Sequence, residues 1–114
     1  MMKTILVVCN HGNTSQMVSL ELKRQMEDCE FLARGALTKV PTDLEISNAA
    51  AIILPFDETY LARLESGNMV NSFFKLWVQF YKRIKGKPIF KYMDSKTGDF
   101  VDFLSLAGEL RKIA

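Results

Sequence analysis

The sequence has 114 residues, the size of one ordinary domain, so we expect a single domain over residues 1–114. Hydrophobic residues make up 48% and charged residues 25%, a balance that excludes a disordered chain and provides enough apolar material for a core. A formal net charge of +2 is too small to indicate nucleic acid as a partner. Basic residues gather late in the chain, where a helix end and a solvated face account for them: Lys82, Arg83, Lys85, Lys87 and Lys91.

The two cysteines, Cys9 and Cys29, provide no disulfide framework, and no cysteine or histidine spacing indicates a zinc site. The opening apolar run over residues 5–8 is far too short for a signal peptide or a membrane span. We therefore expect a protein of the reducing cytoplasm, with no metal and no membrane partner.

The first half of the chain alternates between strand and helix patterns. Residues 5–8 are a continuous apolar run, rich in β-branched residues, which ends at a polar loop and predicts a strand buried on both faces. Residues 14–27 predict a helix, and residues 31–33 predict a second strand that ends near Gly35. The apolar stripe of that helix consists of Met17, Val18, Leu22 and Met26.

Residues 41–45 predict the start of a short helix. Thr42 can cap the first amides and Glu45, three residues later, can reach back, which is the spacing of a capping box. Residues 49–54 predict the third strand, and Pro55 ends it.

The second half contains the clearest helical pattern in the sequence. Residues 56–68 predict the longest irregular stretch, with room for one helical turn at 60–64. Asn68 can then cap a helix that ends at Gly86, with Pro88 following. Its stripe has a clean 3.6-residue period: Val70, Phe73, Phe74, Trp77, Val78, Tyr81 and Ile84. We expect this stripe to face the sheet; its excess of aromatic residues leaves a homodimer interface as the alternative.

The chain closes with another strand, a loop and a helix. Residues 89–93 predict the fourth strand and residues 94–98 a loop. The final helix should pack against the sheet through Phe100, Phe103, Leu104, Ala107 and Leu110.

This alternation predicts an α/β fold: a doubly wound parallel sheet of four strands in the order 2-1-3-4, in a three-layer α/β/α arrangement. The strand order reverses between the first and third strands, so the loops that follow them should line a cleft. That prediction places residues 9–15 beside residues 55–60, with residues 94–98 joining them after the fourth strand.

The loop over residues 9–15 has the composition of an anion site. A strand end, a polar turn with glycine and a helix start leave free amides that carry partial positive charge. Gly12 lets the backbone approach a small phosphate-bearing ligand closely, and the neighbouring side chains are short and polar. The simpler alternative is that these residues only form the turn and cap the helix. Cys9 is then a buried apolar side chain and His11 a solvent-facing turn residue.

Gly12-Asn13-Thr14, followed by Met17-Val18, resembles the phosphate loop of flavodoxin-like proteins. There a Thr-Gly-Asn-Thr sequence opens the first helix and holds the phosphate of flavin mononucleotide (FMN). Further matches follow in that family's order: Thr59-Tyr60, Gly67-Asn68-Met69, Phe73 and Trp77, and Lys85-Gly86-Lys87-Pro88.

This resemblance implies a flavodoxin-like fold, bound FMN and electron transfer with a redox partner protein. The cofactor-binding residues that it implies are Asn10, His11, Gly12, Asn13, Thr14 and Ser15 at the phosphate, Pro55, Phe56 and Tyr60 along the isoalloxazine, and Asp94, Ser95 and Gly98 on the other side. Cys9 and His11 stand where the family usually has hydroxyl residues.

Cys9 at the end of the first strand, followed by Gly12, Thr14 and Ser15, resembles the active loop of the B components of the bacterial sugar phosphotransferase system. In that family the cysteine takes a phosphoryl group from a histidine and passes it to a sugar. The resemblance implies a catalytic phosphocysteine at Cys9 and a phosphotransfer partner protein. The family's lactose and cellobiose branch is also short and uses four strands in the order 2-1-3-4.

A third alternative is a flavodoxin-like scaffold that binds a partner protein and no cofactor. The exposed edge of the fourth strand would then need covering, for example by self-association.

Overall fold

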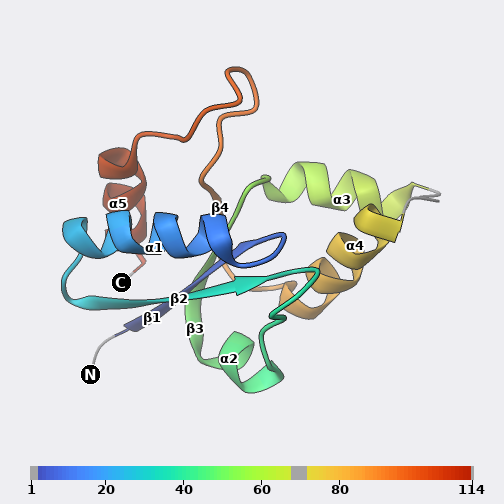
Figure 1. The fold of residues 1–114 in the computed structure, drawn as a ribbon, viewed down its shortest axis with the longest axis horizontal. Coiled ribbons are helices and arrows are strands. Elements are labelled where there is room, and N and C mark those ends of the chain that lie inside the picture. The colour runs from blue at the N-terminus through green and yellow to red at the C-terminus, as the bar shows by residue number, and fades with distance from the viewer. Residues whose placement is uncertain (1–2, 68–71, 114) are drawn as a thin grey trace.

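The computed structural model describes residues 3–67 and 72–113. Along the chain lie β1 (Lys3–Cys9), α1 (Asn13–Gln25), β2 (Cys29–Gly35), α2 (Asp43–Asn48), β3 (Ala49–Leu54), α3 (Glu58–Ser66), α4 (Ser72–Ile84), β4 (Ile89–Lys91) and α5 (Phe103–Arg111). Figure 1 shows their arrangement in space.

The strands form one four-stranded parallel sheet in the order β2-β1-β3-β4, which confirms the predicted topology. The side chains of β1 alternate between two cores: Ile5, Val7 and Cys9 face α1 and α5, whereas Leu6 and Val8 face α2, α3 and α4. The result is a three-layer α/β/α fold in which the carboxyl ends of all the strands share one edge of the sheet.

The short helix α2 begins as predicted. The Thr42 hydroxyl accepts the N–H of Glu45 at 3.1 Å, and the Glu45 carboxylate accepts the N–H of Thr42 at 3.0 Å. This reciprocal pair is the capping box that the sequence predicted.

Helix α1 also forms, but its buried face is narrower than predicted. Val18, Leu22 and Met26 are buried, whereas Met17 is 41% exposed, so its assignment to the buried stripe is wrong. In its place the small side chain of Ser15 is buried under the first turn of the helix. Its hydroxyl donates to the carbonyl oxygen of Arg34 in β2 at 2.9 Å, so the first turn of the helix lies close to that strand.

The stretch predicted to be irregular contains α3, a helix of nine residues. Asp57 caps it, since its carboxylate accepts the N–H of Tyr60 at 2.8 Å. The helical turn predicted at 60–64 lies within this helix, but Leu61 is its one fully buried residue, so the apolar pattern is too short to predict the full length.

The long helix α4 buries the aromatic face that its period predicted. Trp77, Tyr81 and Ile84 belong to the core, together with Phe80, which the predicted stripe omits. The predicted cap Asn68 and the stripe residue Val70 lie outside the described residues. A homodimer interface on this helix stays a prediction.

The end of the chain departs most from the prediction. β4 stops at Lys91, and Met93 instead forms an antiparallel bridge with Phe100. Helix α5 begins only at Phe103, which leaves Phe100 before the helix and 41% exposed. Leu104 is 65% exposed because α5 buries a different face, formed by Leu106, Ala107 and Leu110. The predicted packing of Phe100 and Leu104 against the sheet is therefore wrong.

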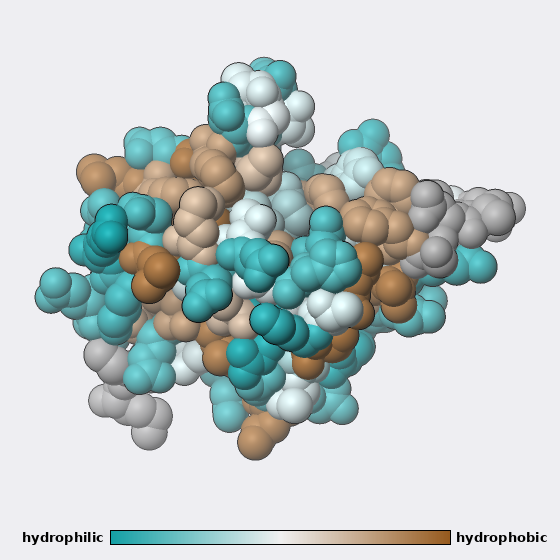
Figure 2. Space-filling model, viewed as in Figure 1, coloured by the Kyte–Doolittle hydropathy of each residue, from teal (hydrophilic) through white to brown (hydrophobic). Residues whose placement is uncertain are grey.

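The loop between Met93 and Phe100 projects from the body of the molecule (Figure 1). Hydrophilic side chains cover much of the face drawn in Figure 2, with hydrophobic patches between them. Over residues 3–67 and 72–113, no helix combines the length and the apolar character needed to cross a bilayer.

Candidate functional site

The sulfur of Cys9 lies at the centre of the loop that joins β1 to α1. Its Sγ atom accepts the backbone N–H of Gly12 at 3.0 Å and that of Ser15 at 3.3 Å. The thiol donates to the Ser15 hydroxyl oxygen at 3.4 Å, and that oxygen lies 2.9 Å from the carbonyl oxygen of Arg34. Once the thiol is ionised, the Ser15 hydroxyl can instead donate to the sulfur, because a thiolate only accepts hydrogen bonds.

These contacts favour the thiolate. Burial raises the pKa of Cys9, but hydrogen bonds from the Ser15 side chain and from the backbone of Ser15, Gly12 and His11 outweigh it, so the pKa lies below its ordinary value. Cys29 shows the opposite: burial and the nearby Asp28 carboxylate raise the pKa of its thiol. At a given pH, Cys9 is therefore the cysteine with the larger thiolate fraction.

Gly12 leaves the Cys9 sulfur room to reach the backbone N–H groups at the start of α1. It is the N-cap residue of α1 and has a φ of +96°, a left-handed conformation that side chains disfavour. It has no side chain with which to cap the helix, so the N–H of Ser15 in the first turn remains available to the sulfur. Cys9 thus takes the place of the capping side chain.

A second loop, over residues 35–39, supports the Cys9 loop from the side of β2. The N–H of Ala36 donates to the carbonyl oxygen of Cys9 at 2.8 Å, and the N–H of Leu37 donates to that of Asn10 at 3.0 Å. The backbone on either side of the sulfur is therefore fixed by hydrogen bonds from another segment. Sequence reasoning missed this support.

Gly35 allows the two loops to approach this closely. A Cβ atom at this position would lie 2.1 Å from the carbonyl oxygen of Thr38 and 2.7 Å from that of Asn10. The Thr38 hydroxyl in turn lies 3.0 Å from Nδ1 of His11, within hydrogen-bonding distance. His11 is therefore held by the supporting loop, although its side chain is exposed.

A cavity of about 460 Å³ opens beside the Cys9 loop, at the carboxyl edge of the sheet where the strand order reverses. Its walls come from three loops: Cys9, Asn10, His11, Asn13 and Thr14 after β1, Pro55 and Phe56 after β3, and Tyr92, Met93 and Phe100 after β4. One side of the cavity is therefore polar and the other largely aromatic. This meeting of the loops after β1 and β3 is the one that the topology predicted.

The predicted site residues divide into three groups. Asn10, His11, Asn13, Thr14, Pro55 and Phe56 line the cavity, whereas Gly12 and Ser15 lie behind the sulfur and donate to it. Tyr60 lies outside the cavity and packs on Phe56, with ring centroids 5.0 Å apart.

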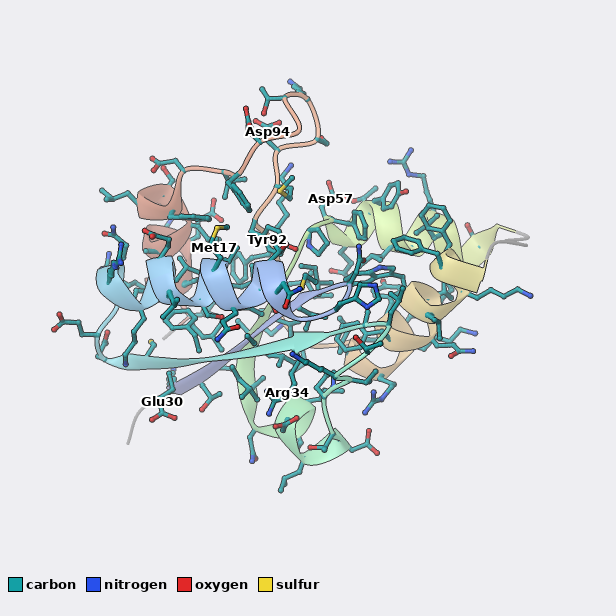
Figure 3. All side chains as sticks on the ribbon, viewed as in Figure 1. Met17, Glu30, Arg34, Asp57, Tyr92 and Asp94 are labelled. Carbon is teal, nitrogen blue, oxygen red and sulfur yellow. The ribbon has the colours of Figure 1, made fainter. Side chains whose placement is uncertain are left out.

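Asp94, Ser95 and Gly98 belong to the projecting loop and do not line the cavity. The loop closes on itself, because the N–H of Gly98 donates to the carbonyl oxygen of Asp94 at 2.8 Å. Figure 3 shows Asp94 in this loop and Tyr92 nearer the sheet. Contact between these residues and a ligand stays a prediction.

Tyr92 is the most informative residue that sequence reasoning missed. It is buried, and the lack of solvent together with the charge of Cys9 raises the pKa of its phenol. Tyr92 lines the cavity, and the O–H of a tyrosine can donate a hydrogen bond. It lies within the segment predicted as the fourth strand, so the signal was its position next to a strand end.

A larger hollow of about 590 Å³ lies between α1 and β2, with Gln16, Leu20 and Phe31 among its lining residues. Neither cysteine nor histidine lines it, so the chemically reactive groups belong to the smaller cavity. In the part of the chain that the structure describes, no group of three or more His, Cys, Asp or Glu residues is placed to hold a metal ion.

Comparisons with known proteins find one similar solved structure. No protein-family model matches the chain, and a search of curated proteins finds no match. Among solved structures, the chain is similar to a domain of the fructose-specific IIABC component of the PTS system from Borrelia burgdorferi. The two are 16% identical, with a TM-score of 0.42, over 99% of this chain and 90% of that chain. The function proposed below therefore rests on the geometry of the Cys9 loop.

Proposed function

We propose that this protein is a phosphocarrier in which Cys9 accepts a phosphoryl group from a partner protein and passes it on, in the manner of the B components of the sugar phosphotransferase system. The observation that carries the proposal is the pair of backbone donors, Gly12 and Ser15, directed at the Cys9 sulfur. They favour the thiolate, which is the nucleophilic form of cysteine.

The chemistry balances as a simple displacement. The Cys9 thiolate attacks the phosphorus of a phosphohistidine on the donor protein, so an S–P bond forms and the P–N bond breaks. The electron pair of the broken bond stays on the imidazole nitrogen. In the second step the hydroxyl oxygen of the acceptor sugar attacks the same phosphorus and gives its proton to water, so an O–P bond forms, the S–P bond breaks and the thiolate is released. No oxidant, metal or cofactor is required.

The surroundings of the sulfur suit a bound phosphoryl group. Asn13 and Thr14 belong to the first turn of α1, whose amides have no acceptor within the helix. Both residues also line the cavity. The positive end of the helix dipole would further stabilise the dianion.

The binding of FMN is the second candidate, and the aromatic wall formed by Phe56, Tyr92 and Phe100 favours it. It ranks second because four residues that the flavodoxin resemblance implies for the flavin do not line the cavity: Tyr60, Asp94, Ser95 and Gly98.

The test is phosphorylation by phosphohistidine-bearing proteins of the phosphotransferase system, followed by intact mass spectrometry. We expect the chain to gain one phosphoryl group, Cys9→Ser to abolish the gain, and the matched variant Cys29→Ser to retain it. A titration with FMN, followed by flavin fluorescence, runs in parallel. Saturable FMN binding that survives Cys9→Ser, without phosphorylation by any donor, would replace the first proposal by the second.

A further inference from the structure

A hydrogen bond connects the Cys9 loop to helix α4 on the other side of the sheet. The indole N–H of Trp77 donates to Oδ1 of Asn10 at 2.9 Å, although the two residues are 67 positions apart. Trp77 is fully buried, and Asn10 directly follows Cys9. The residue next to the nucleophile is therefore held by a side chain from the distant core.

This bond determines which way the Asn10 amide faces. An indole N–H can only donate, so the amide oxygen must face Trp77 and the amide nitrogen must face away from it. The backbone of Asn10 is fixed as well, because its carbonyl oxygen accepts the N–H of Leu37 at 3.0 Å. Among the residues that the structure describes, Nδ2 makes no hydrogen bond, so its two donors remain available to a ligand.

Asn10 lines the same cavity as Cys9. An amide nitrogen with two unused donors, on a residue that lines this cavity, favours a ligand that accepts hydrogen bonds. The three oxygens of a phosphoryl group are strong acceptors, and a donor near them stabilises their charge.

We propose that Asn10 binds the phosphoryl group held at Cys9 through Nδ2, and that Trp77 is the positioning residue that sets this orientation. The inference rests on the proposed function, since it concerns the group that Cys9 would carry. It adds a reason for Trp77 to be a tryptophan: a phenylalanine could fill the core but has no N–H for Asn10.

Trp77 also contacts the cavity wall. Its ring meets that of Phe56 edge-on, with centroids 5.1 Å apart, and Phe56 lines the cavity. The chain contains one tryptophan, so its fluorescence reports on this place alone. An oxyanion bound at Asn10 should therefore change the emission of Trp77.

The experiment uses inorganic phosphate as the probe and the alkylation of Cys9 by iodoacetamide as the readout, in the full chain with Cys29→Ser. We expect phosphate to slow alkylation and to shift the Trp77 emission. Asn10→Ala should weaken phosphate protection about tenfold, the loss typical of a hydrogen bond to a charged group. Asn10→Asp should weaken it further, because a carboxylate still accepts from the indole but repels the anion.

A double-mutant cycle between residues 77 and 10 separates the positioning role of Trp77 from simple packing. Trp77→Phe should weaken protection several-fold when residue 10 is asparagine, and have no further effect when it is alanine. Tyr81→Phe is the matched control, because Tyr81 is a buried aromatic residue of the same helix whose hydroxyl donates instead to Glu58 at 3.3 Å. It should leave protection unchanged.

Additive effects of Trp77→Phe and Asn10→Ala, or full protection in Asn10→Ala, would overturn the inference. Full protection in Asn10→Ala can be measured even if Trp77→Phe fails to fold, so the inference can still be tested. This experiment needs no donor protein, so its failure is distinguishable from failure of the proposed function. If Cys9 is phosphorylated equally well in the parent and in Asn10→Ala, the inference is wrong and the proposed function still stands.

Discussion

The sulfur of Cys9 caps the helix that Ser15 helps to begin. The N–H of Ser15, in the first turn of α1, donates to Sγ at 3.3 Å, a role that usually belongs to the side chain of the N-cap residue. Here the N-cap is Gly12, so the helix depends on the thiol of the preceding strand. The same contact therefore stabilises the helix and lowers the pKa of the Cys9 thiol.

The first prediction concerns the two cysteines. At neutral pH a limiting amount of iodoacetamide should modify Cys9 well before Cys29, because the thiolate is the reacting form and only Cys9 has a lowered pKa. Peptide mass spectrometry over time measures both rates in one sample. Equal rates, or faster modification of Cys29, would contradict the assignment of Cys9 as the nucleophile.

The second prediction compares two buried serines of α1. Ser15→Ala should lower the free energy of unfolding by about 1–3 kcal/mol, because it removes a hydroxyl bonded to the sulfur and to the Arg34 carbonyl. It should also raise the pKa of Cys9, measured from thiolate absorbance against pH in a Cys29→Ser background. Urea unfolding gives the stability.

Ser19→Ala is the matched control for this pair. The hydroxyl of Ser19 is buried and has no hydrogen-bond partner within residues 3–67 and 72–113. Its removal should therefore leave both stability and the Cys9 pKa nearly unchanged, or raise stability slightly. If the two alanine variants behave alike, the contacts of Ser15 with the sulfur have no energetic importance.

The fold was predictable because its strongest signals are local. The apolar runs over residues 5–8 and 49–54 lie in β1 and β3, the two central strands, and such strands need apolar side chains on both faces. Only one turn of helix α3, at 60–64, was predicted, because the helix buries one residue completely and its apolar pattern is short. Its cap, Asp57, was visible in the sequence but is a weak signal alone.

The site was predictable only in part, for a related reason. Cys9 and Gly12 lie in one loop whose composition indicates an anion site, so sequence reasoning found them. Trp77 and the supporting loop at 35–39 reach the site through tertiary contacts, which no local pattern encodes. A buried tryptophan at helical spacing predicts a core position, and the hydrogen bond it makes there depends on the whole fold.

The third prediction is a pH dependence of stability. Arg34 holds Glu45 through two hydrogen bonds of 2.6 and 3.2 Å. The Arg34 guanidinium, aided by the N–H of Thr42, lowers the pKa of Glu45 below its ordinary value of 4.5. A carboxyl whose pKa is lowered by folding stabilises the protein above that ordinary value, and this contribution is lost as the pH falls through the folded pKa.

Glu45→Gln tests this, because glutamine can still accept the Thr42 N–H in the capping box but cannot titrate. The variant should be less stable than the parent at neutral pH, and the difference should shrink as the pH falls below about 4.5. Urea unfolding at a series of pH values measures it. A difference that stays constant down to acid pH would mean that the ion pair does not govern the acid sensitivity.

The last prediction concerns the glycine that lets the two loops meet. In Gly35→Ala the new Cβ would lie 2.1 Å from the carbonyl oxygen of Thr38, a backbone atom that cannot move alone. We expect a loss of about 3 kcal/mol in unfolding free energy and a raised pKa of Cys9, because the loop that fixes its backbone must shift.

Gly108→Ala is the control. Gly108 lies within α5, and a Cβ atom there meets nothing within 4 Å. Alanine should therefore stabilise the helix by about 1 kcal/mol. If Gly35→Ala is as stable as the parent and leaves Cys9 equally reactive, the loop at 35–39 does not determine the geometry of the nucleophile.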